Sequence, residues 1–171
     1  HMRLVKLEDI ETTKPFDCGD SDLNGFFCDD ACYYHEQMIA NTFVLEDDTD
    51  TIAFFSLLND KISQKSVPNN LWRKLRKNIP HRKHFSSYPA IKIGRLAISK
   101  KHQRKGLGTT LLSAIKQMSI NPTSPLSASR FLTVDAYVAA VPFYEENGFV
   151  KLVNIAEGDT VPMYYDLKQL K

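Results

Sequence analysis

The sequence predicts a single α/β (α+β) domain built around one mixed sheet. Segments with the period of β-strands recur along the chain, and segments with the 3.6-residue period of helices lie between them. The 171 residues, 43% of them apolar and 25% charged, suit one globular domain with a hydrophobic core. We therefore expect residues 3–171 to form one domain, and we take residues 1–2 to be a cloning remnant.

The N-terminal part predicts a strand and then a helix. The segment "RLVKLEDI" at residues 3–10 is typical of a strand. Asp20 or Ser21 is expected to cap the following helix, because its side-chain oxygen can accept an otherwise unpaired backbone N–H. The apolar residues expected on the buried face of this helix share helical spacing: Leu23, Phe27, Ala31, Tyr34 and Met38.

A hairpin and a basic helix are expected next. "TFVLE" and "TIAFFSLL" flank the polar turn "DDTD", which predicts a β-hairpin. Residues 69–84, "NNLWRKLRKNIPHRKH", predict a short basic helix that Asn69 or Asn70 caps and that ends before Pro80. Leu71 and Leu75 would then pack inward.

The C-terminal half predicts strands that alternate with helices. "AIKIGRLAI" at residues 90–98 ends in a continuous apolar run, as a central strand does. A helix that ends near residues 118–119, the strand "RFLTVDAY" and the short helix "AAVPFYEEN" follow. Gly148 is expected to close that helix in the left-handed conformation, and "FVKLV" and "PMYYDL" are expected to be the last strands.

The overall composition excludes several functional classes. The net charge of +2 does not by itself indicate nucleic-acid binding, and no apolar run approaches the roughly 20 residues that a membrane helix needs. Without a recognisable signal peptide, we expect a cytoplasmic protein with no membrane partner. Cys28, Cys32 and His35 share a helical stripe, but a structural zinc site needs four ligands, so no metal is expected.

The segment "QRKGLGT" at residues 103–109 is unusual for the start of a helix. Each Gly costs up to about 1 kcal/mol relative to Ala in a helix, so two of them indicate a need for bare backbone. A helix N-terminus carries unpaired N–H groups and a partial positive charge, and four bases lie nearby: Lys100, Lys101, Arg104 and Lys105. The segment therefore favours a pyrophosphate-binding loop, with an ordinary surface turn as the alternative. It matches neither the dinucleotide loop nor the Walker loop.

A second candidate site lies in "VPFYEENGF" at residues 141–149. Tyr144 could protonate a departing thiolate, because the unperturbed pKa values of about 10 for tyrosine and about 8.5 for a thiol lie close together. The alternative is that Tyr144 is a core aromatic, a role that Phe143 would also fit. A pyrophosphate site combined with an acid for a thiolate describes acyl transfer from coenzyme A.

The order of "LAISKKHQRKGLGTTLL" and "VDAYVAAVPFYEENGF" resembles the GNAT acetyltransferase superfamily. Gln103, Gly106 and Gly108 match the signature loop [QR]-x-x-G-x-[GA] of that family, and the resemblance extends over nearly the whole chain. It implies a GNAT-like domain with a mixed, mostly antiparallel central sheet flanked by helices. It also implies an acyltransferase that uses acetyl-CoA as cosubstrate.

Residue roles follow from the resemblance. Leu96, Ala97 and Ile98 would pair through their backbone with the pantetheine arm of the coenzyme, and Tyr144 would be the general acid. Many relatives have Asn seven residues before this Tyr, where this chain has Tyr137. The residues expected to hold the pyrophosphate are Gln103, Arg104, Lys105, Gly106, Leu107, Gly108 and Thr109.

The expected reaction is direct attack of a neutral primary amine on the acetyl carbonyl, without a covalent enzyme intermediate. An ordinary amine is protonated at pH 7, so a base or a water chain must remove a proton. The sequence leaves this base open, with Asp135, Glu46 and Asp60 as candidates.

The acceptor amine also has alternatives. "FDCGDSDLNGFF" followed by "IKIGRLAI" is similar to a narrower group that includes toxins which acetylate aminoacyl-tRNA and pair with an antitoxin. That similarity places Arg95 near the acceptor pocket. The basic stretch at residues 69–84 would then contact RNA phosphates, with Trp72 and the histidines available for stacking. The other interpretations are acetylation of a small amine or a protein amine and a non-catalytic acyl-CoA-binding module, and either a homodimer or a monomer is compatible with the sequence.

Overall fold

The computed structural model describes residues 1–80, 83–121, 126–153 and 158–171. The chain divides into two compact units, one formed by His1–Leu58 with Ile93–Ser113 and the other by Asn59–Lys92 with Ala114–Lys171. We call these unit 1 and unit 2. Strands β3 and β4 and helix α4 each continue from one unit into the other along the chain.

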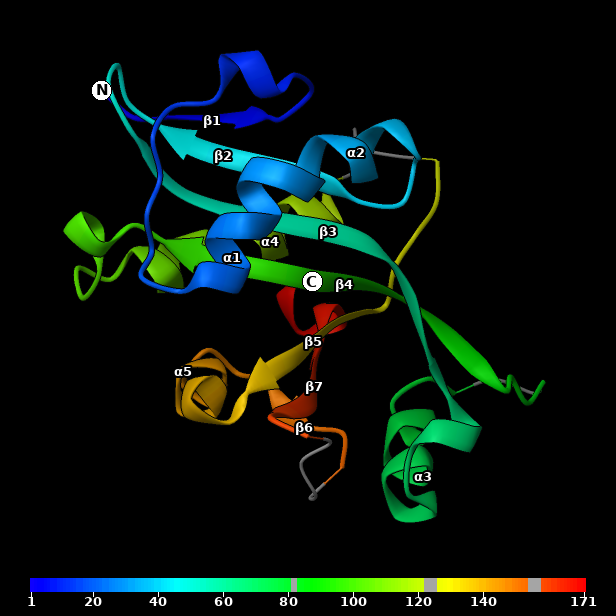
Figure 1. The fold of residues 1–171 in the computed structure, drawn as a ribbon. Helices are drawn as coiled ribbons and strands as arrows, with labels where there is room; N and C mark the ends of the chain where they lie inside the picture. The colour runs from blue at the N-terminus through cyan, green and yellow to red at the C-terminus, as the bar shows by residue number, and fades with distance from the viewer. Residues whose placement is uncertain (81–82, 122–125, 154–157) are drawn as a thin grey trace. The chain divides into compact units, whose positions relative to one another are not determined.

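The strands form one seven-stranded sheet in the order β1-β2-β3-β4-β5-β7-β6, which confirms the predicted fold class (Figure 1). The helices are α1 (Ser21–Gly25), α2 (Ala31–Glu36), α3 (Asn69–Lys77), α4 (Leu107–Ile120) and α5 (Val141–Glu146). The strands are β1 (Arg3–Lys6), β2 (Asn41–Glu46), β3 (Thr51–Ser63), β4 (Ser87–Ile98), β5 (Phe131–Tyr137), β6 (Val150–Lys151) and β7 (Thr160–Asp166). No described helix is long and apolar enough to cross a membrane.

Unit 1 is organised around the predicted hairpin. Strands β2 and β3 pair antiparallel, and β1 pairs antiparallel with β2. Helices α1 and α2 lie over these strands (Figure 1), where Phe27 and Phe54 stack at a centroid distance of 4.9 Å. Both rings are buried, so aromatic packing fixes the first helical segment on the sheet.

The first helix was predicted as one continuous element, and residues 21–36 are helical without a break. Asp20 caps it as expected, accepting from the backbone N–H groups of Asp22 and Leu23. Its middle part, Phe26–Asp30, is π-helical and joins α1 to α2. Because the helix ends at Glu36, Met38 lies outside it with φ of 57° and is 92% exposed, so its predicted burial was wrong.

Unit 2 contains β5, β7 and β6, which pair antiparallel in that order. Its core includes Trp72 and Leu75 of α3, and the Trp72 ring stacks on Tyr88 of β4 at 5.3 Å. Helix α3 ends at Lys77, before Pro80 as predicted. Pro68, not an asparagine, occupies its N-cap and no side chain caps it, because the helix begins at Asn69 itself.

The end of α5 is built as the sequence predicts. The C-cap is Asn147, and Gly148 follows with φ of 87°, a left-handed conformation that glycine adopts without strain. The backbone N–H of Gly148 donates to the carbonyl of Glu145 at 3.1 Å. This turn directs the chain from α5 into β6.

Candidate active site

The loop between β4 and α4 is held in place by Gln103. Its side-chain amide donates to the backbone carbonyls of Cys18 at 3.0 Å and Ile98 at 2.9 Å. Two residues of the loop have left-handed backbones, Arg104 with φ of 61° and Gly106 with φ of 78°. The side-chain amide of Gln103 is therefore occupied by hydrogen bonds within the protein, although residues 103–106 are all exposed.

Helix α4 begins directly after this turn, at Leu107. The carbonyl of Gly106 accepts from the backbone N–H of Thr110, so the first N–H groups of the helix have no intrahelical acceptor. A Cβ at Gly106 would meet no atom within 4 Å, so the space beside the backbone is open. The arrangement presents backbone donors and the positive end of a helix to an anion.

The end of β4 precedes the loop and contains the predicted pantetheine-contacting residues. Ala97 is buried, whereas Leu96 and Ile98 are partly exposed. The Arg95 guanidinium lies 4.1 Å from the ring centroid of Phe26 and 6.0 Å from that of Tyr34. These aromatic contacts, which place Arg95 against the first helical segment, are cation–π interactions.

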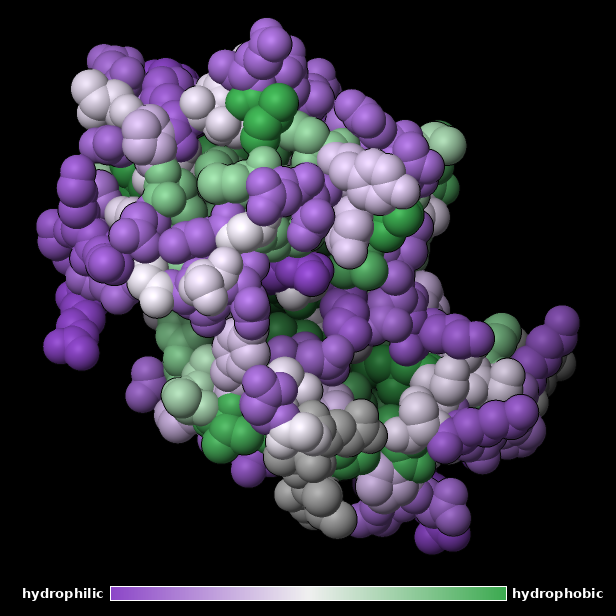
Figure 2. Space-filling view, in the orientation of Figure 1, coloured by the Kyte–Doolittle hydropathy of each residue, from purple (hydrophilic) through white to green (hydrophobic). Residues whose placement is uncertain are grey.

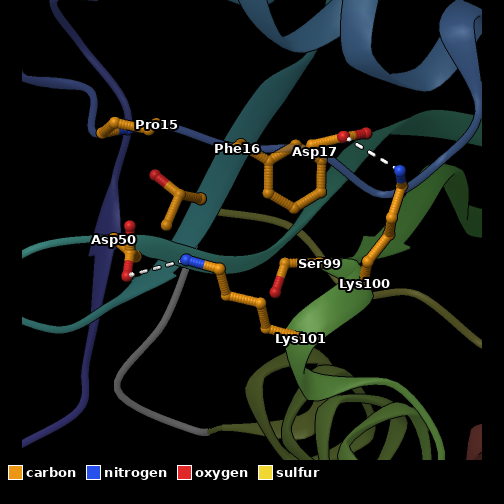
Figure 3. A pocket seen from close by; sticks show the side chains of 8 residues that line it. Pro15, Phe16, Asp17, Asp50, Ser99, Lys100 and Lys101 are labelled. Atoms are coloured by element: carbon orange, nitrogen blue, oxygen red, sulfur yellow. Dashed lines mark ion pairs between the residues drawn. The ribbon is translucent and has the colours of Figure 1, made fainter.

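A cavity of about 290 Å³ lies in unit 1 beside the start of the loop (Figure 3). Lys100 pairs with Asp17 at 3.3 Å, and Lys101 pairs with Asp50 at 3.9 Å. The loop residues predicted to bind pyrophosphate do not line this cavity. Lys100 and Lys101 are therefore neutralised by neighbouring carboxylates, unlike the free bases that the sequence led us to expect.

Tyr144 lies in unit 2 on α5 and is buried, with 6% of its surface exposed. Its ring makes edge contacts with Phe143 at 5.1 Å and Phe149 at 5.3 Å. Burial raises the pKa of Tyr144 to about 12. The phenol is therefore protonated throughout the physiological range, which is the state that a general acid needs.

Lys116, which sequence reasoning did not single out, supports the end of α5. Its ammonium donates to the carbonyl of Asn147 at 2.7 Å and lies 4.1 Å from the ring centroid of Tyr165. Burial lowers the pKa of Lys116. A single lysine within an apolar helical pattern gives no signal of this role, because the partner is a distant backbone carbonyl.

The three candidate bases have different surroundings. Glu46 is buried under Lys14 at 2.6 Å and Arg3 at 2.8 Å, and the hydrogen bond from Lys14 is the main reason that its pKa is lowered. Such a carboxylate is a weak base. Asp60 accepts from the Thr133 hydroxyl at 2.6 Å, and the half-exposed Asp135 pairs with Lys92 at 2.6 Å.

The structure thus brings the loop, the β4 end and Arg95 together in unit 1, and Tyr144 and Asp135 belong to unit 2. The predicted stacking role of Trp72 is wrong, because Trp72 is 2% exposed and its ring already stacks on Tyr88. Within the described ranges, no cluster of histidine, cysteine and carboxylate side chains is arranged to hold a metal.

Comparison with known proteins supports the family predicted from the two motifs. Residues 82–165 match the model described as the acetyltransferase (GNAT) domain. The chain is also 26% identical over 107 residues to a "tRNA-acetylating toxin" of Mycobacterium tuberculosis (strain ATCC 25618 / H37Rv), a match that covers 63% of this chain. The chain spans only 59% of the length of that relative. These matches confirm the resemblance to GNAT acetyltransferases.

Solved structures share the fold. A bacterial toxin superposes with a TM-score of 0.80 at 18% identity, covering 99% of this chain and 93% of its own. AtaT complexed with acetyl-methionyl-tRNAfMet gives 0.76 at 21% identity, covering 99% and 97%. A mutant AtaT toxin bound to the C-terminus of the antitoxin AtaR and acetyl-CoA gives 0.71 at 19% identity, covering 99% and 96%. At these identities the likeness shows the fold.

Proposed function

We infer that this chain, which resembles the GNAT acetyltransferases, is an acetyl-CoA-dependent N-acetyltransferase that acts on a primary amine. The observation that carries the inference is the loop at residues 103–109. Its left-handed Gly106 leads into the N-terminus of α4, and the space beside its backbone is open. Backbone N–H groups there suit the pyrophosphate of coenzyme A, which needs several donors close together.

Each part of the coenzyme would meet a different element. The loop from Gln103 to Thr109 would hold the pyrophosphate, and the backbone of residues 96–98 would pair with the pantetheine arm. Because Ile98 already shares its carbonyl with the Gln103 amide, the loop and the strand end are braced against each other within unit 1. No metal is needed for this chemistry.

The proposed reaction has one bond-forming and one bond-breaking step. The amine nitrogen attacks the acetyl carbonyl carbon, the C–S bond breaks, and Tyr144 gives its phenolic proton to the departing thiolate. A pKa of about 12 makes this transfer less favourable than the unperturbed value suggested, but burial raises the pKa of a thiol as well. After the attack the nitrogen carries one extra proton, which it loses to Asp135 or to water to give the neutral amide, and a proton from the same route restores the Tyr144 phenol.

Aminoacyl-tRNA is the acceptor that the comparisons favour, since the matched relative is named a tRNA-acetylating toxin. An antitoxin partner and a cytoplasmic location would accompany that function, and a homodimer stays a prediction. Acetylation of a small amine or a protein amine is the alternative. The Arg95 guanidinium, oriented by Phe26, would then face the acceptor in either case.

The decisive experiment supplies radiolabelled acetyl-CoA to the purified protein with a desalted cell lysate and separates RNA, protein and small molecules. Label in RNA that mild alkaline deacylation releases would establish aminoacyl-tRNA as the acceptor. Label in protein or in small amines would establish the alternative. Absence of label in every fraction, with coenzyme binding intact, would contradict the enzymatic proposal and leave a binding module.

The matched variant is Tyr144→Phe, which keeps the ring and removes the proton donor. We expect the turnover number to fall by about 10²–10⁴-fold, with little change in acetyl-CoA affinity. Unchanged turnover would remove Tyr144 from the proposed mechanism without affecting the coenzyme site.

A further inference from the structure

The charges of this protein are segregated along the chain. Sixteen of its 22 Lys and Arg residues lie between residues 61 and 134, and none of its 20 Asp and Glu residues does. The net charge of +2 conceals this distribution, because the acids are confined to the two flanking segments. A long segment whose charged residues are all basic is typical of a surface that binds a polyanion.

Within unit 2 this segment forms a cavity of about 450 Å³ beside α3. Four cationic side chains line it, together with Tyr88, Ile79 and Pro80: Arg73, Arg76, Lys77 and Lys83. Arg73 and Lys77 are exposed. Figure 2 shows hydrophilic residues gathered over the region of α3.

Several described bases, such as Lys92, Lys100 and Lys101, form ion pairs with carboxylates, whereas three cations of this cavity do not. Across the part of the chain that the structure describes, no carboxylate forms an ion pair with Arg73, Arg76 or Lys77. Arg76 instead contacts the Nδ1 atom of His84. By contrast, Lys100 and Lys101 of the unit 1 cavity each pair with an aspartate (Figure 3). An anion that binds Arg73, Arg76 or Lys77 would therefore displace no described carboxylate from them.

The frame of the cavity is well anchored. Tyr88 packs face to face on Trp72, a buried residue of α3. At the end of the helix, the Asn78 carbonyl accepts from Arg130, whose guanidinium is paired with Asp166 at 2.7 Å. The bases therefore extend from a fixed helix, and little ordering is required when they bind.

The spacing of the bases favours a chain of phosphates over one small anion. Arg73, Arg76 and Lys77 stand at positions i, i+3 and i+4 of α3, where side chains on one helix face begin about 5–6 Å apart. A single anion could engage one or two of them, whereas a polynucleotide backbone supplies successive phosphates to all of them. Sequence-independent contacts of this kind provide much of the affinity of nucleic-acid-binding proteins.

We propose that the α3 cavity is an RNA-phosphate-binding site that positions an RNA-linked acceptor through Arg73, Arg76 and Lys77. This inference rests on the proposed function, because it identifies RNA as the carrier of the amine. It also replaces the base-stacking role predicted for Trp72 with phosphate contacts alone. Binding should therefore depend strongly on salt and weakly on sequence.

The test measures binding of deacylated tRNA to the purified full chain by fluorescence anisotropy over a range of salt concentrations. We expect R73Q/K77Q to bind more weakly than the unmodified protein. Its slope of log K against log[salt] should be shallower by about 1.4–1.8, because each lost phosphate contact contributes about 0.7–0.9. The matched control is K6Q/K168Q, which removes two exposed lysines outside the basic segment and should leave the slope unchanged.

Two further measurements keep the result decisive. R73K/K77R preserves both charges and should restore the slope, and thermal melting establishes that each variant is folded. An unchanged slope in R73Q/K77Q, equal losses in K6Q/K168Q, or binding to anionic lipid vesicles without binding to tRNA would each overturn the proposal. Because deacylated tRNA has no acceptor amine, this test is independent of acetyl transfer, which the radiolabel experiment measures.

Discussion

The unit 1 cavity beside the loop and the α3 cavity are both lined by basic residues, yet their electrostatics differ. In the unit 1 cavity Lys100 forms an ion pair with Asp17, and Lys101 forms one with Asp50. Beside α3 in unit 2, no described carboxylate forms an ion pair with Arg73 or Lys77. Where the acids lie, and not where the lysines lie, therefore determines which surface is available to an anion.

The comparison also separates two ways of binding phosphate. The loop at residues 103–109 offers backbone N–H groups and a helix terminus, which fix the geometry of one pyrophosphate. The α3 cavity offers flexible side chains, which suit a backbone of varying register. The first should be sensitive to a change in backbone conformation, and the second to the number of charges.

The largest effect on acetyl-CoA affinity is expected for Gly106→Glu. The new carboxylate repels the pyrophosphate, and a non-glycine residue is strained at φ of 78°. Acetyl-CoA affinity should fall by at least about 100-fold, which corresponds to about 2.7 kcal/mol or the loss of one or two charge-assisted hydrogen bonds. Calorimetric titration measures this, with Gly106→Ala as the control that adds strain without charge. If the glutamate variant binds as tightly as the unmodified protein, the loop is not the anion site.

The second prediction concerns the buried acid of unit 2. The phenol of Tyr144 is protonated below about pH 10 in both the folded and unfolded chain. Between pH 10 and 12 the unfolded chain loses this proton and the folded chain, with a pKa of about 12, retains it. Folding stability should therefore decrease as pH rises through this window, by about 2.7 kcal/mol from Tyr144 alone. Denaturant titrations of the unmodified protein and Tyr144→Phe should diverge there, and parallel curves would contradict the burial.

The sequence could predict the parts of the site that depend on local conformation. Gly106 and Gly148 both have the left-handed backbones that their contexts require, and Asp20 is the expected cap. The position of Met38 could not be predicted, because the helix ends at Glu36 and no glycine or proline follows it to indicate that end.

Contacts between residues that lie far apart in the sequence could not be predicted either. Trp72 lies in a basic stretch that looks exposed, and only its contact with Tyr88, sixteen positions away, shows that it belongs to the core. The pairing of Lys101 with Asp50 likewise joins residues far apart in the chain. Charge counts therefore predicted where bases are numerous, and the fold determined which of them are neutralised.

Lys116 is a cation of unit 2 that, unlike Arg73 and Lys77, contacts a backbone carbonyl and an aromatic ring. Lys116→Met should lower the free energy of unfolding by about 1–3 kcal/mol, because a charged hydrogen bond to Asn147 and the contact with Tyr165 are lost. The turnover number should fall while KM is retained, since the end of the Tyr144 helix loosens. Lys116→Arg, which preserves the donor, is the control. Full stability in the methionine variant would show that the contact with Asn147 is dispensable.

Glu46 is a carboxylate of unit 1 that forms ion pairs with two bases, Arg3 and Lys14. Its pKa is lowered chiefly by the hydrogen bond from Lys14, so its stabilising effect is present above the ordinary pKa and is lost as pH falls through the lowered value. Glu46→Gln should reduce stability at pH 7 by about 1–2 kcal/mol and should flatten the acid limb of the stability profile. Denaturant titrations between pH 3 and pH 7 measure both the stability at pH 7 and its decrease in acid. If the decrease in acid is as steep in the variant as in the unmodified protein, groups other than Glu46 cause it.

The smallest effect is expected for K100Q/K101Q, the counterpart in unit 1 of the α3 double variant. Both lysines are well exposed, and each is paired with an aspartate, so their charges are already compensated. Exposed pairs of this kind contribute about 0–1 kcal/mol, and we expect acetyl-CoA affinity to change by less than about threefold. Calorimetry under the conditions used for the Gly106 variants makes the measurement directly comparable. A tenfold loss of acetyl-CoA affinity would mean that the lysines leave Asp17 and Asp50 to reach the coenzyme. An ion pair with a carboxylate would then not prevent a base from binding an anion.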